Sequence, residues 1–374
     1  MNDFAAIIHP VNLELLHIFD EGTKRGRKDL TEKVLEWTPA FKASRITGAR
    51  SITGKEIDGY FVMCPLLPNQ MLTMDPKFVV KRVVEAGKIA ESLGVKIIGL
   101  GAYVALVGKR GALIAKNLNI PVTAGTSYTI AIALEGIFTA AKAIGLKLND
   151  ARAAIIGATG TIGSICSNIL AEKVRFLYLV ARNKQRLSDL VYNIRNGKKN
   201  IAKLEISDNI KTTVCNSDIV LTSTNTPEIL IELSNLKPGT IVCDISQPRN
   251  VSEEQAKRRD DILVIDGGVV KPPGEVNFNF NFGLASGLTF ACIAEAMILA
   301  FEERYESYSI GGNITLKKVK EIFELGRKHG FELAKLRSFD TEIKREKIEK
   351  VKKARRNTTG FKIFPLNNFF SKKQ

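Results

Sequence analysis

The amino-acid sequence predicts an α/β protein with a central Rossmann-like, doubly wound parallel sheet, an N-terminal α/β domain and C-terminal helices. Three observations support this fold class. Strand-like and helix-like segments alternate from Ala151 onward, which is typical of a parallel sheet. The first of these strands leads into a glycine-rich turn that opens a helix. The chain has 374 residues, of which 45% are hydrophobic, and this suffices for two or three domains with a real core.

The N-terminal α/β domain is predicted over residues 1–148. Short apolar runs predict strands at residues 4–10, 60–67 and 95–103, and residues 76–93 have the pattern of an amphipathic helix. Residues 127–146 predict a mostly buried helix that ends near Gly145. The order of the strands in the sheet does not follow from this pattern.

The Rossmann domain is predicted over residues 149–285. Residues 151–173 and 175–197 each have the pattern of a strand followed by a helix. Further strands are expected at residues 217–224, 239–246 and 262–268.

The C-terminal part of the chain divides into helices over residues 286–337, which carry Cys292, and a basic tail over residues 338–374. Charge patterning favours a solvated, partly disordered tail. The alternative is a contact with an acidic carrier protein or a membrane surface, for which the tail offers apolar anchors at Phe361, Phe364, Phe369 and Phe370.

Composition narrows the classes of function. Lys and Arg number 55 against 39 Asp and Glu, a formal net charge of +16 that suits an anionic partner such as nucleic acid, a membrane surface, an acidic carrier or a phosphorylated cofactor. No nucleic-acid module is apparent, so nucleic acid is not expected. Five scattered cysteines without a CxxC pair indicate free thiols in a reducing compartment, and three histidines give no metal motif. Without a secretory pattern or a long enough apolar run, a cytoplasmic, metal-free protein is expected.

A dinucleotide site is predicted at the sequence GATGTIG, with glycines at 157, 160 and 163. The spacing is GxxGxxG rather than GxGxxG, but the turn follows a strand and opens a helix. Glycine allows a tight turn and a close approach of backbone amides to a pyrophosphate, and the helix N-terminus adds partial positive charge. The cofactor-binding residues predicted here are Gly157, Thr159, Gly160, Thr161, Ile162 and Gly163.

The end of the next strand predicts NADPH rather than NADH. An NAD site usually has Asp or Glu there, but the sequence LYLVARNKQR has none. Its polar and basic residues suit a ribose 2′-phosphate, since Arg offers a planar fork to phosphate oxygens. A basic helix start on a basic protein is the alternative, although cations are disfavoured at a helix N-terminus. The residues assigned to the 2′-phosphate side are Arg182, Asn183, Lys184 and Arg186.

Three residues that follow later strands, Ser223, Thr224 and Gly268, are expected to line the nicotinamide side of the cofactor. Open α/β sheets bind ligands at the carboxyl ends of their strands. Turn formation alone explains these residue types equally well.

Cys292 is the candidate nucleophile. No tyrosine has a lysine four residues later, and no GxSxG motif is present, which disfavours a short-chain dehydrogenase and a serine hydrolase. A thiolate can attack an acyl group and form a thioester that a hydride then reduces to an aldehyde. A place in the first turns of a helix, with Ser286 or Thr289 as cap, would lower the pKa of the thiol. Free cysteines more often pack in the core, so spacing alone does not decide the role.

The sequence resembles the long-chain fatty acyl-ACP reductase family from the N-terminus to about Phe331. The resemblance lies in SITGKEIDGYFVMCPLLPNQML, AAIIGATGTIGS, LYLVARNKQRL, IDGGVV, FACIAEAMILAFE and RKHGF. The catalytic cysteine of the family occupies the place of Cys292 in FACIAE. The resemblance implies NADPH-dependent reduction of acyl-ACP, and often of acyl-CoA, to a fatty aldehyde through a thioester on that cysteine. Residues 1–148 and the C-terminal helices would then enclose the acyl chain.

The chain also departs from the family. Where cyanobacterial members have roughly TGNTHTA, this chain has AGTSYTI, with Tyr128 in place of a histidine. Ser127, Tyr128 and backbone amides near Cys292 are candidate donors to an oxyanion. The segment KPPGEVNFNFNFGLASG looks shorter than its counterpart, and the tail after Arg337 has none that we recognise.

Two other functions remain open from the sequence. A shikimate- or amino-acid-type NADP-dependent dehydrogenase would act on a small alcohol or amine without a covalent intermediate. A non-enzymatic sensor or scaffold would bind the cofactor and use its basic tail to contact nucleic acid or membrane.

Overall fold

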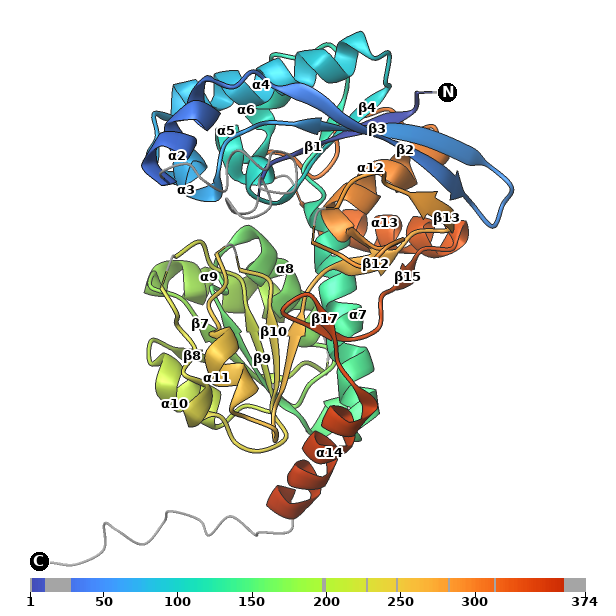
Figure 1. Ribbon diagram of the computed structural model, residues 1–374. Coiled ribbons are helices and arrows are strands. Elements are labelled where there is room, and N and C mark those ends of the chain that lie inside the picture. Colours follow the sequence, from blue (N-terminus) through green and yellow to red (C-terminus); the bar gives the residue numbers. More distant parts are fainter. Residues whose placement is uncertain are drawn as a thin grey trace, which may run out of the picture.

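The structure, a computed structural model, describes residues 2–10, 28–196, 200–226, 228–246, 248–281, 283–312 and 314–359. It contains two six-stranded sheets in two domains, and the long helix α7 (Thr126–Ile144) runs through both (Figure 1). One sheet is wholly parallel and flanked by helices, which confirms the predicted fold class.

The sheet of the N-terminal domain has the strand order β13-β2-β3-β1-β4-β5. β1 lies between β3 and β4 and is parallel to both, as is typical of a strand buried on both faces. β2 pairs antiparallel with β3, and β13 pairs antiparallel with β2 at the edge. The strands are β1 (Phe4–Ile8), β2 (Phe41–Arg50), β3 (Glu56–Met63), β4 (Ile97–Leu100), β5 (Val122–Thr123) and β13 (Gly274–Asn277). The helices are α2 (Lys28–Trp37), α3 (Pro68–Thr73), α4 (Pro76–Ser92), the 3₁₀ helix η2 (Ala102–Leu106), α5 (Val107–Arg110) and α6 (Ala112–Ala115).

β13 belongs to the span that the sequence predicted as Rossmann domain, residues 149–285, yet it pairs with β2 of the N-terminal domain. Ala49 lies opposite Gly274, and Thr47 lies opposite Asn277. The chain therefore returns to the N-terminal domain before residue 285. Sequence patterning could not place this short edge strand, because its partner lies more than 220 residues away.

The Rossmann sheet has the order β11-β10-β9-β6-β7-β8, and every neighbouring pair is parallel. From the other edge this is the 3-2-1-4-5-6 order of dinucleotide-binding domains, with the topological switch point between β6 and β9. The strands are β6 (Arg152–Ile156), β7 (Phe176–Val180), β8 (Lys203–Ser207), β9 (Ile219–Thr222), β10 (Ile241–Asp244) and β11 (Leu263–Asp266). Its helices are α8 (Thr161–Leu170), α9 (Lys184–Arg195), α10 (Ile210–Cys215) and α11 (Glu253–Lys257), with the 3₁₀ turns η3 (Leu148–Asp150) and η4 (Leu233–Asn235) at its margins.

Helix α7 begins directly after β5 in the N-terminal domain and packs against β10 and β11 of the Rossmann domain (Figure 1). Its length and apolar composition would suffice to cross a membrane, which the sequence analysis did not anticipate, but 67% of the apolar window is buried within the protein. The helix is apolar because one part of it packs against a C-terminal helix that also contacts the N-terminal sheet, and another part packs against the Rossmann domain. It therefore serves as a core helix shared by the two domains.

The chain after residue 268 builds a third layer against α7. This part of the chain forms a small sheet of order β14-β12-β15. Two of its strands precede a pair of helices in the sequence and the third follows them, and the helices pack on each other and on α7. These elements are β12 (Val269–Lys271), β14 (Thr289–Phe290), α12 (Ala291–Phe301), α13 (Leu316–His329) and β15 (Glu332–Leu333).

The prediction of a disordered tail from residue 338 is wrong as far as residue 359. A hairpin of β16 (Arg337–Ser338) and β17 (Thr341–Glu342) leads into α14 (Arg345–Thr359), and both pack on the Rossmann domain. Val351 of α14 has no exposed surface. Basic residues of α14 reach carboxylates of the Rossmann domain, at 2.7 Å for Lys350 Nζ to Asp260 and 3.0 Å for Arg355 Nη1 to Asp218. The rest of the tail, with its four phenylalanines, lies outside the described residues.

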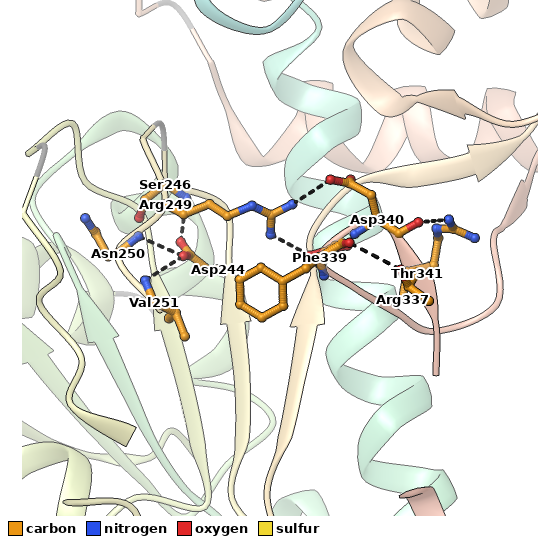
Figure 2. Close-up of polar contacts among 10 residues, drawn as sticks. Asp244, Ser246, Arg249, Asn250, Val251, Arg337, Phe339, Asp340 and Thr341 are labelled. Carbon is orange, nitrogen blue, oxygen red and sulfur yellow. Dashed lines mark hydrogen bonds and ion pairs between the residues drawn. The ribbon is translucent and has the colours of Figure 1, made fainter. Parts of the chain in front are cut away.

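A polar cluster fastens the hairpin to the end of β11 (Figure 2). Asp266, the last residue of β11, accepts the backbone N–H groups of Phe339 at 3.0 Å and Asp340 at 2.8 Å. Arg249 pairs with Asp266 at 2.6 Å and with Asp340 at 3.3 Å, and its guanidinium lies over the Phe339 ring. Charge pairing and stacking at one point explain why the chain returns to the Rossmann domain here.

If α14 is docked, Val351→Ala should lower the free energy of unfolding by about 2 kcal/mol, because it removes buried methyl groups from a packed site. Urea denaturation followed by circular dichroism measures this. Lys353→Ala, at an exposed position of the same helix, is the control and should change stability by less than about 0.5 kcal/mol. Equal stability of Val351→Ala and wild type would show that α14 is not packed in solution.

Candidate active site

Cys292 is the second residue of α12 and is half-buried. The N-cap of this helix is Phe290, with no side-chain cap, so the prediction that Ser286 or Thr289 would cap it is wrong. Thr289 lies in β14 instead, opposite Val270 of β12. Its buried hydroxyl has no hydrogen-bond partner within the described part of the chain.

The thiol of Cys292 faces backbone amides from two elements. The N–H groups of Ile293, in its own helix, and of Ala102, just beyond the carboxyl end of β4, point at the sulfur. Burial nevertheless raises the pKa of Cys292 above its usual value, and the charge of Glu295 adds to the rise, while the amides oppose it. The expected fall in pKa is therefore wrong on balance, because desolvation of a thiolate outweighs a few oriented amides.

Gly125 brings the start of α7 against Cys292. A Cβ atom on Gly125 would lie 2.2 Å from the Cα atom and 2.5 Å from the Cβ atom of Cys292. The φ angle of Gly125 is +68°, in the left-handed region that favours glycine. Any larger residue at this position would displace the cysteine.

Glu295, one helical turn after Cys292, was missed by the sequence analysis. It has no exposed surface, and its carboxylate accepts the backbone N–H of Tyr128 at 2.8 Å and the hydroxyl of Thr123. The Ser309 side chain and the Gly125 backbone lie close enough to favour its charged form as well. Burial raises the pKa of Glu295, and these donors oppose the rise. A glutamate inside an otherwise continuous apolar helix was the signal that could have identified it, since buried charges require partners.

The predicted oxyanion donors Ser127 and Tyr128 lie in the core at the start of α7. The Ser127 hydroxyl accepts a hydrogen bond from Ser309 Oγ at 2.7 Å, and its backbone N–H donates to the same oxygen at 3.0 Å. The Tyr128 ring packs edge-on against Phe331, and a Cβ on Gly326 of α13 would lie 2.7 Å from its hydroxyl oxygen. Neither side chain hydrogen-bonds to the Cys292 thiol in the described structure, so this placement favours packing over catalysis.

The glycine turn after β6 has the geometry of a dinucleotide cradle. A Cβ on Gly157, whose φ is +85°, would lie 2.7 Å from Ser223 O, and one on Gly163 would lie 2.2 Å from Gly157 O. Thr159 lies in the turn, Gly160 is the N-cap of α8 without a side-chain cap, and Thr161 and Ile162 open the helix.

Ser223 and Thr224 follow β9 beside this turn and differ in their hydrogen bonding. The Thr224 hydroxyl donates to Asn250 Oδ1 at 2.6 Å. The Ser223 hydroxyl is buried and has no partner among the described residues. Three features fit a dinucleotide cofactor. The glycine turn leaves no room for side chains, the helix N-terminus has no side-chain cap, and the buried Ser223 hydroxyl has no partner among the described residues.

Of the four polar and basic residues predicted to bind the cofactor after β7, two have side chains with a partner within the described structure and two do not. Asn183 caps α9 by accepting the Arg186 N–H at 2.9 Å, and Lys184 pairs with Asp208 at 3.1 Å. Arg182 and Arg186 are exposed, and their side chains form no ion pair with any described residue. They are therefore available to an anion at the carboxyl end of β7.

Gly268, two residues after the carboxyl end of β11, joins the Rossmann sheet to the cysteine helix. Its carbonyl accepts the backbone N–H of Ala291, the residue before Cys292, at 2.7 Å. A Cβ on Gly268 would lie 3.6 Å from the Thr129 side chain and 3.7 Å from that of Ala291. The exit of β11, the start of α7 and the start of α12 thus meet at one point.

A second polar cluster, also missed from the sequence, includes a histidine of the RKHGF segment. Ser51 Oγ lies 2.8 Å from His329 Nδ1, and His329 Nε2 lies 2.6 Å from Glu302 Oε1. The Ser51 hydroxyl also accepts the Thr53 N–H, and Ile52 N donates to His329 O at 3.1 Å. Burial lowers the pKa of His329. The cluster holds the tip of the β2–β3 hairpin on the end of α13.

Comparisons with known proteins agree with the cofactor geometry. The family model for shikimate / quinate 5-dehydrogenase matches residues 139–266, about a third of the chain. A protein of Synechococcus elongatus named long-chain acyl-[acyl-carrier-protein] reductase is 28% identical over 347 residues, which cover 88% of this chain and 98% of that protein. The Serratia protein named aminotransferase PigE is 28% identical over 319 residues. The match covers 84% of this chain but only 36% of the Serratia protein.

Among solved structures, L-tryptophan dehydrogenase from Nostoc punctiforme is similar with a TM-score of 0.39 and 11% identity, over 96% of this chain and 88% of that one. The sequence relatives and the matched dehydrogenase domain indicate an NAD(P)-dependent oxidoreductase distantly related to the acyl-ACP reductase.

We expect Glu295→Ala to lower the free energy of unfolding by about 3 kcal/mol, because it leaves buried donors of Thr123 and Tyr128 without an acceptor. Glu295→Gln should cost less, since an amide retains one acceptor oxygen. Thermal and urea denaturation measure both. Glu324→Ala, at an exposed position of α13, is the matched control. A neutral Glu295→Ala variant would refute the bridging role of this carboxylate.

Proposed function

We propose that the protein reduces a fatty acyl thioester, carried by acyl carrier protein or by CoA, to a fatty aldehyde, with NADPH as reductant and Cys292 as nucleophile. The observation that carries the proposal is the contact between Gly268, at the cofactor edge, and Ala291, next to Cys292. This contact supports the proposal because it joins the cysteine helix to the carboxyl-terminal side of the Rossmann sheet, the side on which such sheets bind their ligands. The relationship to the Synechococcus elongatus reductase supports the same substrate class.

The first half of the reaction is acyl transfer. Cys292 loses its proton, and its sulfur attacks the carbonyl carbon of the thioester to form a tetrahedral oxyanion. The bond between that carbon and the carrier sulfur then breaks, and the carrier leaves as a thiol with the proton. The amides of Ala102 and Ile293 already point at the sulfur, so they are placed to stabilise negative charge beside it.

The second half is reduction of the acyl group on Cys292. NADPH, when bound, supplies the hydride that reduces the thioester carbonyl. Addition of hydride and a proton gives a hemithioacetal on Cys292, and cleavage of its carbon–sulfur bond releases the aldehyde and restores the thiol. The half-buried setting of Cys292 limits hydrolysis of the thioester by water before reduction.

The proposed preference for NADPH rests on Arg182 and Arg186. Both are exposed, both lack an ion-pair partner in the described structure, and both follow the strand whose end faces the adenosine ribose. The fit of Arg to phosphate oxygens supports a 2′-phosphate here.

A second candidate is a dehydrogenase of the shikimate type, favoured by the domain match over residues 139–266. It would oxidise a small alcohol or amine reversibly and would need no cysteine. Cys292→Ser separates the two, because only the thioester reductase should lose turnover.

Incubating the protein with an acyl-CoA or acyl-ACP in the absence of NADPH should add the mass of one acyl group at Cys292, measured by intact and peptide mass spectrometry. Cys292→Ala should remain unmodified and form no aldehyde. Cys215, which is also half-buried, is the internal control peptide and should stay free. Because burial raises the pKa of Cys292, the acylation rate should still be rising with pH above neutrality. Aldehyde production by Cys292→Ala would overturn the assignment.

The double substitution Arg182→Ala with Arg186→Ala should raise the KM for NADPH on the order of tenfold or more, since each charge-assisted bond to the phosphate is lost. The KM for NADH should change little. Lys184→Ala is the matched control and should have the smaller effect, because Lys184 already pairs with Asp208. A wild-type preference for NADH in steady-state kinetics would contradict the proposal.

A further inference from the structure

The loop after β4 has an unusual backbone on the same side of the sheet as Cys292. It starts at Ala102, whose N–H points at the Cys292 sulfur and whose φ is +44°. It ends in four consecutive residues with positive φ, from Gly108 to Gly111, at +60°, +57°, +56° and +77°. Lys109 and Arg110 occupy the middle of this left-handed turn, which is disfavoured for residues with a Cβ atom. Backbone strain of this kind is typical of functional loops.

Arg110 is a half-buried cation that has no counter-charge among the described residues. Its guanidinium forms no hydrogen bond or ion pair with any residue that the structure describes, and burial lowers its pKa. Several other partly buried arginines are paired with carboxylates, as Arg249 is with Asp266 and Arg355 is with Asp218. An unpaired cation removed from water is costly unless an anion completes the site.

Lys109 adds a second cation next to Arg110. It is exposed, and its ammonium likewise pairs with no described carboxylate. The turn that carries both side chains is closely packed: a Cβ on Gly108 would lie 3.1 Å from the Leu113 side chain and 3.2 Å from that of Val80.

The turn is tied to the elements that hold Cys292. Gly311 N donates to Arg110 O at 2.9 Å, and a Cβ on Gly111 would lie 2.9 Å from the Leu100 side chain and 3.4 Å from that of Ile310. Ile310 follows Ser309, which hydrogen-bonds to Ser127 at the start of α7, two residues after Gly125 and its contact with Cys292. The cations and the thiol are therefore fixed in one framework.

We propose that Lys109 and Arg110 form a subsite for the phosphate of the phosphopantetheine arm, which the thioesters of acyl carrier protein and CoA share. The inference rests on the proposed function, because the thioester at one end of the arm must reach Cys292 while the phosphate lies at the other end. Arg offers a planar pair of donors to phosphate oxygens, and Lys adds a compact charge beside it.

The test compares thioesters of one acyl chain: acyl-pantetheine, which lacks the phosphate, acyl-4′-phosphopantetheine, acyl-CoA and acyl-ACP. Wild type should have a KM on the order of tenfold lower for each phosphate-bearing thioester than for acyl-pantetheine. Arg110→Asn should raise the KM for the phosphate-bearing thioesters by a similar factor and leave kcat and the acyl-pantetheine KM unchanged. Asn tolerates the left-handed conformation, so this variant should fold with an unfolding temperature at or above that of wild type. Lys109→Asn should show the same selectivity, with a smaller effect.

Lys116→Asn is the control, because it removes one exposed positive charge from the C-terminus of α6, close in sequence to the turn. It should leave every KM unchanged. An equal loss in Lys116→Asn, or an Arg110→Asn variant that handles all four thioesters like wild type, would overturn the subsite while leaving Cys292 catalysis intact. A loss confined to acyl-CoA would also overturn it, because the nucleotide phosphates would then be the ligand. Failure of every thioester to acylate wild-type Cys292 would remove both this inference and the proposed function.

Discussion

The buried carboxylate of Glu295 is the contact on which the arrangement of the site depends. It lies on the helix that carries Cys292. It accepts hydrogen bonds from Thr123, just before α7, and from Tyr128, at the start of α7, the helix that covers the Rossmann sheet. A charge-bearing group in a core is costly, and here several donors compensate for the lost water. Because one carboxylate holds both helix starts, the position of the thiol relative to both domains follows from it.

Two glycines allow the elements around that carboxylate to close on the thiol. Gly125 lets the start of α7 touch Cys292, and Gly268 lets the exit of β11 reach the residue before it. The Ala102 amide approaches from the N-terminal domain. The sulfur therefore sits where three chain segments from different parts of the sequence converge, which is compatible with the role proposed for Cys292.

Local pattern was enough to predict the Rossmann sheet, the cradle at Gly157 and the cysteine helix, because strand alternation and glycine spacing are properties of short segments. Features set by distant contacts could not be predicted in this way. The pairing of β13 with β2 and the docking of α14 through Arg355 depend on partners far away in the sequence. The pKa of Cys292 was misjudged for the same reason, since the helix start is visible in the sequence but its burial is not. Glu295 was overlooked because its partners come from the other side of the fold.

The return of the chain to the Rossmann domain through the Arg249–Asp266–Asp340 cluster has a mechanical consequence. The polypeptide passes between the two domains along α7, again after β11, and a third time between β15 and β16. Bodies joined by one linker can swing freely, whereas three crossings restrict how far the two domains can move relative to each other. Under the proposed function, entry of the acyl chain and release of the aldehyde would then depend on a small motion that all three crossings permit, rather than on a wide hinge opening.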